Sequence, residues 1–242
     1  MKILIIRHGD PDYENDSLTE KGRREAELLS ERIAPMDIAE YYVSPLGRAQ
    51  ETARYTLEKC GRTAECLDWL HEFDRNLIIG KNGERRIAWD MLPEDWTAVD
   101  DYYSKDKWYD VPVMAEADMK NGAAYVTGGL DQLLAKHGYE RRRSCYHAVR
   151  PNEDTITLFC HFGVECVMLG HLLGISPMVL WHGLMAAPTS VTTLVSEERR
   201  HGTAFFRVTS FGDISHLYAK SEPPAFAGRF CETFDNKEQR HD

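Results

Sequence analysis

The chain has 242 residues, of which 43% are hydrophobic and 28% are charged, and its mean hydropathy is −0.47. These values are typical of a globular protein long enough to bury a core, and we predict a single domain over residues 1–242. Because 39 acidic residues exceed 29 basic ones and give a net charge of −10, the composition argues against a nucleic acid or a membrane surface as partner. No apolar run approaches the ~20 residues of a membrane span, so the expected location is cytoplasmic. The six cysteines form no Cys-x-x-Cys pair, which favours reduced thiols over a disulfide framework or a zinc site.

The first predicted strand ends in two polar side chains. Four consecutive branched aliphatic residues, at positions 3–6, run directly into Arg7-His8-Gly9. Such a run is typical of a short parallel strand that is buried on both faces. Arg7 and His8 should therefore stand at the carboxyl end of a central strand, where open α/β sheets bind their ligands.

Two helices and a second strand are predicted next. Thr19 is a suitable N-cap for a helix whose small and apolar residues recur every three or four positions and which should end before Pro35. Tyr41-Tyr42-Val43 predicts a strand, and a helix with Arg48 in its first turn follows it. An arginine at such a helix N-terminus can bind an anion strongly, although most isolated ones lie on the surface. The alternation of strand and helix indicates a parallel sheet with right-handed crossovers.

Glu72 is a candidate general acid. It lies among apolar residues, in the run Trp69-Leu70-His71-Glu72-Phe73. An apolar setting keeps a carboxyl group protonated to higher pH, which suits proton donation to a leaving group. A structural ion pair with a nearby arginine is the alternative explanation for an acid at this position.

The regular alternation breaks down between residues 76 and 150. Three of the five tryptophans lie there, with several tyrosines, among acids, glycines and prolines. We expect an insertion that covers the ligand end of the sheet, whose aromatic residues either line a pocket or form a small core of their own. Within it, residues 117–136 predict a helix interrupted at Gly128-Gly129, and residues 139–149 predict a two-stranded ribbon around residues 141–143.

A second histidine occupies an equivalent strand end. Residues 155–160 form a β-branched, apolar run that ends in His161-Phe162-Gly163, and residues 164–173 predict a helix. A lone histidine is more often a packing residue than a catalytic one. Two histidines at equivalent strand ends, with Arg7 beside one of them, indicate a shared site. Residues 190–195 and 204–209 predict two further strands.

Taken together, these motifs resemble the histidine phosphatase superfamily, also called the phosphoglycerate mutase-like family. The resemblance rests on Arg7-His8-Gly9, on Leu-Thr-Glu-Lys-Gly at residues 18–22, on Ser-Pro-Leu-Gly-Arg-Ala-Gln-Glu-Thr-Ala at residues 44–53, and on Glu72 and His161. It spans residues 3 to about 217 and leaves the insertion unmatched. It implies an α/β fold, a three-layer αβα sandwich around a mostly parallel sheet, with an inserted cap at about residues 76–150.

The resemblance also implies a role for each candidate residue. His8 would be the nucleophile that forms a phosphohistidine, with its other ring nitrogen held by a backbone carbonyl of the turn. Glu72 would protonate the leaving oxygen and then take a proton from the attacking water. The phosphoryl oxygens would be bound by Arg7, Arg48, His161 and the backbone N–H of Phe162. A small phosphorylated substrate is expected, and the family's reaction needs neither a metal nor a cofactor.

Several positions depart from the family pattern. Many relatives carry an asparagine six residues after the nucleophile, where this chain has Glu14 followed by Asn15, and Phe162 stands where a glycine is usual. The residues after His161 do not resemble the Gly-Asn-Ser-Leu-Arg run of the cofactor-dependent mutases, which favours a phosphatase. A phosphoglycerate mutase and a non-catalytic phosphate-binding module remain as alternatives. The sequence identifies neither the physiological substrate nor the oligomeric state, although exposed aromatic residues and edge strands would permit a homodimer.

Overall fold

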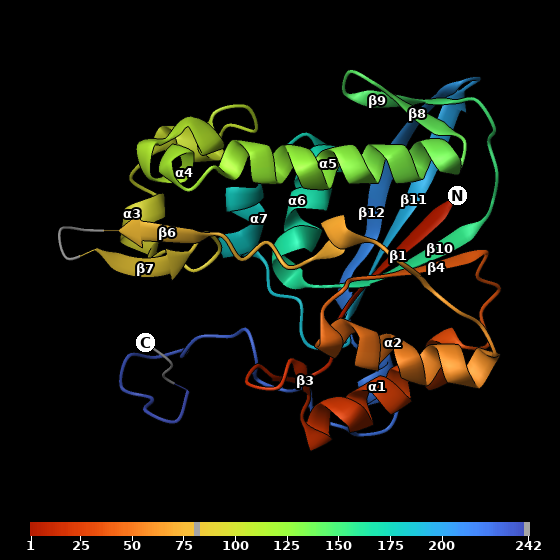
Figure 1. Ribbon diagram of the computed structural model, residues 1–242, viewed down its shortest axis with the longest axis horizontal. Helices are drawn as coiled ribbons and strands as arrows, with labels where there is room; N and C mark the ends of the chain where they lie inside the picture. The colour runs from red at the N-terminus through yellow and green to blue at the C-terminus, as the bar shows by residue number, and fades with distance from the viewer. Residues whose placement is uncertain (80–82, 240–242) are drawn as a thin grey trace.

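A sheet of eight strands forms the centre of the computed structural model, which describes residues 1–79 and 83–239 (Figure 1). The spatial order of the strands is β5-β4-β10-β1-β11-β12-β9-β8. In that order they comprise Glu65–Cys66, Glu40–Val43, Thr155–Cys160, Lys2–Arg7, Val191–Arg200, Thr203–Asp213, Cys145–Ala148 and Tyr139–Arg142. The predicted strand that ends at Arg7 is thus central, with the strand that precedes His161 beside it.

Helices cover both faces of this sheet. In the view of Figure 1, α1 (Glu20–Ile33) and α2 (Gly47–Cys60) lie below the sheet, and the short α8 (Ser215–Tyr218) packs against α1. Above it lie α5 (Met119–Lys136) and α6 (Phe162–Leu173), with α7 (Pro177–Gly183) beside α6. The predicted three-layer αβα sandwich is therefore confirmed. The predicted N-cap is confirmed as well, since the Thr19 side chain accepts a hydrogen bond from the backbone N–H of Gly22.

Only half of the sheet is parallel, which corrects the expectation of a mostly parallel one. Strands β5, β4, β10 and β1 run parallel to one another, whereas β11 pairs antiparallel with β1 and the pairs from β11 to β8 are antiparallel as well. The reason is the length of the connections. Only two residues separate β11 from β12, and a link that short can join only antiparallel strands, because a parallel pair needs a long crossover.

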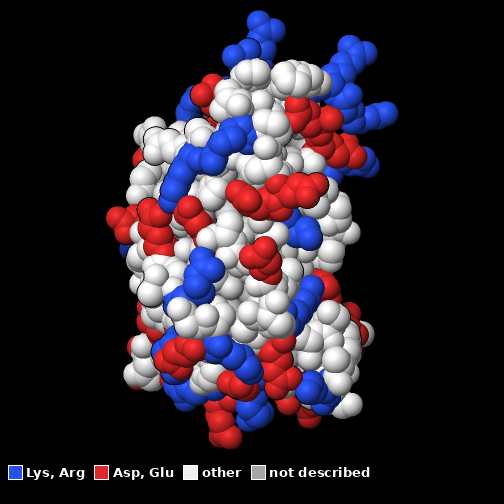
Figure 2. Space-filling view, turned by 90° about the vertical axis from the view of Figure 1, so that its right-hand side faces the viewer, with Lys and Arg blue, Asp and Glu red and all other residues white. Residues whose placement is uncertain are grey.

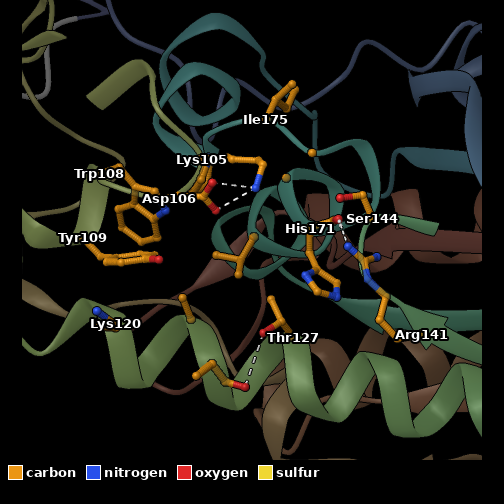
Figure 3. A pocket seen from close by; sticks show the side chains of 16 residues that line it. Lys105, Asp106, Trp108, Tyr109, Lys120, Thr127, Arg141, Ser144, His171 and Ile175 are labelled. Atoms are coloured by element: carbon orange, nitrogen blue, oxygen red, sulfur yellow. Dashed lines mark hydrogen bonds and ion pairs between the residues drawn. The ribbon is translucent and has the colours of Figure 1, made fainter. Parts of the chain in front are cut away.

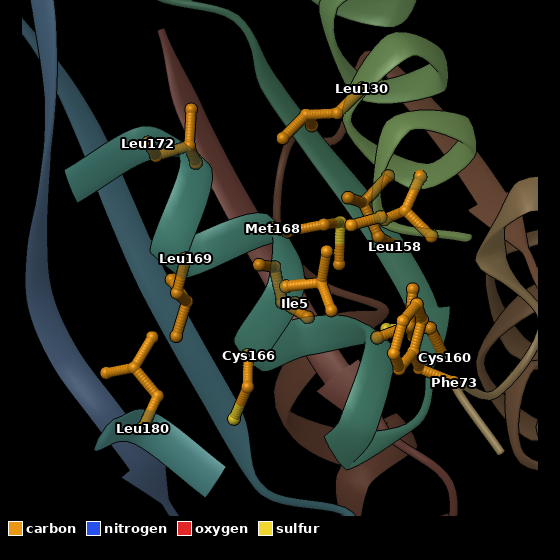
Figure 4. Packing of buried hydrophobic residues seen from close by; sticks show 14 of the residues in the cluster. Ile5, Phe73, Leu130, Leu158, Cys160, Cys166, Met168, Leu169, Leu172 and Leu180 are labelled. Atoms are coloured by element: carbon orange, nitrogen blue, oxygen red, sulfur yellow. The ribbon is translucent and has the colours of Figure 1, made fainter. Parts of the chain in front are cut away.

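The core has two parts, one on each face of the sheet. Ile3 and Ile5 of β1 face α5 and α6, while Leu4 and Ile6 face α1 and α2, as the two-residue period of a strand requires. Figure 4 shows Ile5 and Leu158 of the sheet meeting Met168 of α6, with Leu130 of α5 nearby. A strand buried on both faces leaves its end as the first place where polar side chains can act.

Helix α5 is continuous, so the predicted interruption at Gly128-Gly129 is wrong. The two glycines have different surroundings. A Cβ on Gly128 would meet nothing within 4 Å, whereas a Cβ on Gly129 would lie 2.4–2.6 Å from three ring atoms of Trp69. Gly129 therefore lets the Trp69 ring approach the helix closely. The tertiary packing of α5 outweighs the low helix propensity of the two glycines.

The segment predicted as an insertion has two parts. Its first part lies outside the three layers and holds β6 (Asn76–Ile79), β7 (Glu84–Ile87), α3 (Pro93–Trp96) and α4 (Pro112–Glu116), with short 3-10 turns at Asp100–Tyr103 and Trp108–Asp110. Residues 80–82 lie outside the described residues. Its second part belongs to the sandwich, because α5 covers the sheet and the predicted ribbon, β8 and β9, extends its edge.

The surface near that ribbon mixes charges of both signs. In Figure 2, Lys and Arg alternate with Asp and Glu over the face that carries the β8–β9 edge, and neither sign forms one continuous field. Arg143 sits in the turn of the ribbon with a positive φ of 57°. Among the described residues, no helix combines the length and the apolar character that crossing a membrane requires.

Candidate active site

The two predicted histidines meet at the carboxyl ends of neighbouring strands. Strands β1 and β10 are parallel and pair Arg7 with Cys160, which places His8 and His161 side by side one residue later. Their ring centroids are 5.1 Å apart and the rings are tilted by 55°. His8 is 2% exposed and His161 is fully buried. Parallel pairing in this register is therefore what assembles the pair.

His8 is held in one tautomer by its own turn. Its Nδ1 lies 2.7 Å from the carbonyl oxygen of Gly9. A carbonyl oxygen can only accept, so Nδ1 carries the proton and Nε2 of a neutral ring keeps its lone pair. Burial lowers the pKa of His8 well below its usual value, and the charges of Arg7 and Arg48 lower it further. The expected hydrogen bond to a backbone carbonyl is thus present, and the ring is neutral at neutral pH.

His161 offers a hydrogen-bond donor to the same space. Its Nε2 lies 2.7 Å from the hydroxyl oxygen of Ser44. The same oxygen accepts a hydrogen bond from the backbone N–H of Leu46. Burial lowers the pKa of His161 well below its usual value, and His8 and Arg48 add to this. When the Ser44 hydroxyl donates to Nε2, the proton of the neutral ring is on Nδ1. That nitrogen is buried and has no hydrogen-bond partner among the described residues.

Each of the two arginines is fixed at one edge of its guanidinium group. Arg7 Nη1 donates to the carbonyl oxygens of Ala186, at 2.5 Å, and Ala227, at 3.3 Å. Arg48 Nη1 donates to Oδ1 of Asp16 at 2.6 Å, and the other oxygen of Asp16 accepts from the N–H of Gly47 at 2.6 Å. In both arginines Nε is buried and unpartnered in the described structure.

Glu72 lies at the N-terminus of α6. Its Oε1 accepts from the N–H groups of Phe73, at 2.7 Å, and Val164, at 3.0 Å. Burial raises the pKa of Glu72, and this outweighs the opposing effects of these backbone hydrogen bonds and of Arg7. Gly163 leaves room for the carboxyl group, because a Cβ there would lie 2.6 Å from Oε1. The side chain therefore holds a proton to higher pH than an exposed glutamate would.

The five side chains form what we call the strand-end cluster: Arg7, His8, Arg48, Glu72 and His161. Among the described residues, the cluster contains three buried nitrogens without hydrogen-bond partners, namely Nε of both arginines and Nδ1 of His161. Buried donors without partners are rare in proteins, because they cost free energy. Two cations and one neutral donor are suited to a tetrahedral oxyanion, and the backbone N–H of Phe162, the first residue of α6, adds a further donor.

A cavity of about 460 Å³ opens beside this cluster. Arg7, Glu72 and Phe162 line one end of it. Tyr13 contributes to the remaining wall, together with three segments that are far apart in the sequence: residues 86–96 of the insertion, residues 181–185 around the end of α7, and residues 228–231 near the C-terminus. Residues between 86 and 96 of the predicted insertion therefore line the same cavity as Arg7 and Glu72.

A second cavity, of about 310 Å³, contains none of the predicted site residues (Figure 3). It lies between α5, α6 and the turn around Trp108. The charged groups around it are paired: Lys105 lies 2.7 Å from Asp106, and His171 lies 2.9 Å from Asp131. Arg141 donates to the carbonyl oxygen of His171 at 3.3 Å. The cavity beside the strand-end cluster is therefore the better candidate for a reaction site.

Sequence reasoning missed the residues that position the cluster. Asn15 is exposed and bonds to Asp12, whereas Asp16, which adopts a left-handed φ of 44°, holds Arg48. The motif at residues 44–53 indicates no separate role for Ser44, yet the Ser44 hydroxyl is hydrogen-bonded to His161 and orients its ring. The C-terminal contact, in which Ala227 accepts from Arg7, is made through a backbone atom and leaves no signal in the sequence.

The sequence is similar to a family of known proteins and to several curated proteins. The model of the histidine phosphatase superfamily (branch 1) matches residues 3–207. A probable phosphatase of Schizosaccharomyces pombe is 36% identical over 67 residues, which cover 24% of this chain and 32% of that protein. A probable phosphoglycerate mutase of Enterobacter sp. is 33% identical over 87 residues, which cover 32% of this chain and 40% of that protein. The chain thus spans less than half the length of these curated relatives.

Solved structures show the same fold. The crystal structure of a phosphoglycerate mutase from Bacillus anthracis superposes with a TM-score of 0.62 at 18% identity, covering 92% of this chain and 97% of that one. A likeness at this level of identity supports the architecture alone. The family model, in contrast, matches 205 of the 242 residues and includes the whole strand-end cluster, since residues 3–207 contain Arg7, His8, Arg48, Glu72 and His161. This chain belongs to the histidine phosphatase superfamily, branch 1.

Proposed function

We propose that the chain is a phosphatase that hydrolyses phosphomonoesters through a phosphohistidine intermediate on His8, without a metal ion. The observation that carries this proposal is the state of His8: a neutral ring whose Nδ1 is hydrogen-bonded to the carbonyl oxygen of Gly9, in a cluster that has three buried nitrogens without partners among the described residues. A small phosphorylated substrate would place its phosphoryl group among these donors.

In the first step, Nε2 of His8 attacks phosphorus and the bond from phosphorus to the ester oxygen breaks. Glu72 gives its proton to that oxygen, so the product leaves as a neutral alcohol. The raised pKa of Glu72 supports this role, because the acid must be protonated when the substrate binds. Arg7, Arg48 and Nδ1 of His161 stabilise the charge on the three oxygens that are transferred.

In the second step, a water molecule attacks the phosphohistidine from the side that the alcohol has left. Glu72, now a carboxylate, takes a proton from this water, while the bond from phosphorus to Nε2 breaks. Inorganic phosphate leaves and His8 returns to its neutral form. The hydrogen bond to Gly9 keeps the same ring nitrogen protonated throughout, so the nucleophile needs no proton transfer of its own.

The magnitudes explain why the whole cluster is needed. Enzymes accelerate the hydrolysis of phosphate monoesters by up to ~10²¹-fold, whereas a single general acid contributes ~10²–10⁴-fold. Most of the acceleration must therefore come from charge stabilisation and from the covalent intermediate. The two arginines and His161 provide the first, and His8 provides the second.

A phosphoglycerate mutase is the second candidate, because several curated relatives and a structural neighbour carry that name. The chemistry of the first step would be the same. The reactions differ in what accepts the phosphoryl group from His8: water in a phosphatase, a substrate hydroxyl in a mutase.

Two assays distinguish these reactions. Release of inorganic phosphate from an aryl phosphate, unaffected by a chelating agent, is the expected result for the wild type, together with no interconversion of 3- and 2-phosphoglycerate. His8→Ala should lower the rate by on the order of 10⁴-fold or more, as loss of a nucleophile does. His201→Ala, which removes an exposed histidine from the β11–β12 turn, is the matched control and should leave the rate unchanged. Near-normal hydrolysis by His8→Ala would refute the proposal.

A further inference from the structure

We propose that the leaving group of the substrate is a bulky, largely apolar alcohol with an aromatic ring, and that Trp89 anchors it beside Glu72. This inference rests on the proposed function, and it assigns the cavity beside the strand-end cluster to the alcohol part of the ester. The argument uses the shape, the charges and one unpartnered donor of that cavity.

The wall of the cavity is aromatic and apolar where the leaving group would lie. We call this the cavity wall, and its large apolar members include Trp89, Met91, Trp96, Phe162, Trp181 and Met185. The volume of about 460 Å³ is within the range of sites that enclose a small organic molecule. Because Glu72 lines the same cavity, an ester bound with its phosphoryl group in the cluster would direct its alcohol along this wall.

The Trp96 part of the wall packs against a neutral histidine. The Trp96 ring stacks on His182, with centroids 4.9 Å apart and an interplanar angle of 20°. Nδ1 of His182 donates to the carbonyl oxygen of Met178 at 2.8 Å, and Nε2 accepts from the N–H of Met91 at 3.3 Å. Both nitrogens of a neutral ring are thereby satisfied, so an apolar ring can stack here without ordering new groups.

The cations at the edge of the cavity are engaged with groups of the protein. Arg229 pairs with Glu232 at 2.6 Å, and Arg86 contacts the carbonyl oxygen of Asp90 at 3.5 Å. Arg7 and Arg48 are assigned to the phosphoryl group. A leaving group with a carboxylate would therefore lose its water on entering the cavity and meet no cation dedicated to it, which is unfavourable.

One polar atom of the wall points to the orientation of the ligand. Nε1 of Trp89 is buried and has no hydrogen-bond partner among the described residues. It would lie 2.9 Å from a Cβ on Gly163, and Oε1 of Glu72 would lie 2.6 Å from the same point. A donor without a partner, next to the proposed acid, is suited to an oxygen or a ring nitrogen of the alcohol close to the bond that breaks.

The test compares esters whose leaving groups differ in bulk and not in reactivity. The substrates are 2-(1-naphthyl)ethyl phosphate, ethyl phosphate and 3-phosphoglycerate, all measured as kcat/KM. Even a single methylene group in an apolar pocket changes specificity by about 10-fold or more, so the naphthyl ester should exceed ethyl phosphate by at least that factor. Equal or better hydrolysis of ethyl phosphate or 3-phosphoglycerate would overturn the inference. Failure to hydrolyse any phosphomonoester would instead overturn the proposed function.

Substitutions in the cavity wall test which residues cause the preference for the naphthyl ester. Trp96→Ala should reduce the preference for the naphthyl ester over ethyl phosphate to within about threefold. Met185→Ser offers the same test at a residue that is 40% exposed, so the substitution should not disturb the fold. It should reduce the preference for the naphthyl ester in part. Trp89→Phe keeps the ring and removes the N–H, so it should raise KM for esters with an acceptor near the ester oxygen. An unchanged preference in Trp96→Ala and Met185→Ser, both folded, would overturn the inference.

Discussion

The strand-end cluster and the cavity wall lie side by side and are built in opposite ways. The cluster comes from the ends of β1 and β10, from the first turns of α2 and α6, and from the turn after residues 68–70. Most of the wall comes from three segments, at residues 86–96, 181–185 and 228–231, which do not belong to one common helix or strand. The cluster has buried donors without partners, whereas the charged groups of the wall are engaged. The ends of regular elements thus hold the candidate catalytic residues, whereas the cavity beside them is lined by separate segments of the chain.

The largest effect expected within the cluster, after loss of His8, is that of Glu72→Gln. This change keeps the size of the side chain and removes the proton that Glu72 transfers to the leaving oxygen in the proposed mechanism. We expect kcat/KM for alkyl phosphates to fall by about 10²–10⁴-fold, and the loss to be smaller for 4-nitrophenyl phosphate, whose alcohol leaves without protonation. An equal loss for both esters would show that Glu72 acts by shaping the site and not as an acid.

The pH dependence tests the shifted pKa values of His8 and Glu72. Protonation of His8 stops the reaction at low pH, and since burial lowers its pKa, this acid limb should lie below pH 6.5. Loss of the proton from Glu72 stops it at high pH, and since burial raises that pKa, this alkaline limb should lie above pH 4.5. The wild type should give a bell-shaped profile of kcat/KM, and Glu72→Gln should lack the alkaline limb. The ratio of the two profiles removes the ionisation of the substrate itself, near pH 6.

A smaller loss of activity is expected for a residue that positions a member of the cluster without belonging to it. Asp16→Asn keeps the shape and tolerates the left-handed backbone, but it removes the charge that holds Arg48. We expect kcat/KM to fall by on the order of 10–10²-fold, because a displaced arginine no longer fits the transferred oxygens. Asn15→Ala is the adjacent control, and its exposed side chain should be dispensable. Equal losses in both variants would mean that the whole turn, and not the Asp16 carboxylate, supports the site.

The smallest effects concern the frame that carries Glu72. Gly129→Ala would press a methyl group into the Trp69 ring and should lower the free energy of unfolding by about 1–3 kcal/mol. Gly128→Ala, one residue earlier in the same helix, meets nothing within 4 Å and should raise it by about 0.5–1 kcal/mol. Thermal or urea denaturation measures both. Changes of the same sign would contradict the close approach of Trp69 to α5.

The contrast between cluster and wall also explains what the sequence could predict. The strand ends followed from aliphatic runs that stop at Arg7 and His161, and parallel pairing then brought the two histidines together. The antiparallel half of the sheet was missed because β propensity does not specify direction. Asp16 was missed because its role depends on a turn conformation. The wall could not be predicted, since Trp96, Trp181 and residues 228–231 come together only through tertiary packing.

The phosphohistidine itself is the most direct test of the proposed mechanism. Glu72→Gln should be mixed rapidly with radiolabelled 4-nitrophenyl phosphate, quenched and digested, because the second step needs Glu72 as a base and should be slow. We predict label that is stable to alkali and labile to acid, on the peptide that contains His8, and its absence in His8→Ala. Label on another residue, or an unlabelled His8 while phosphate is released, would contradict the mechanism.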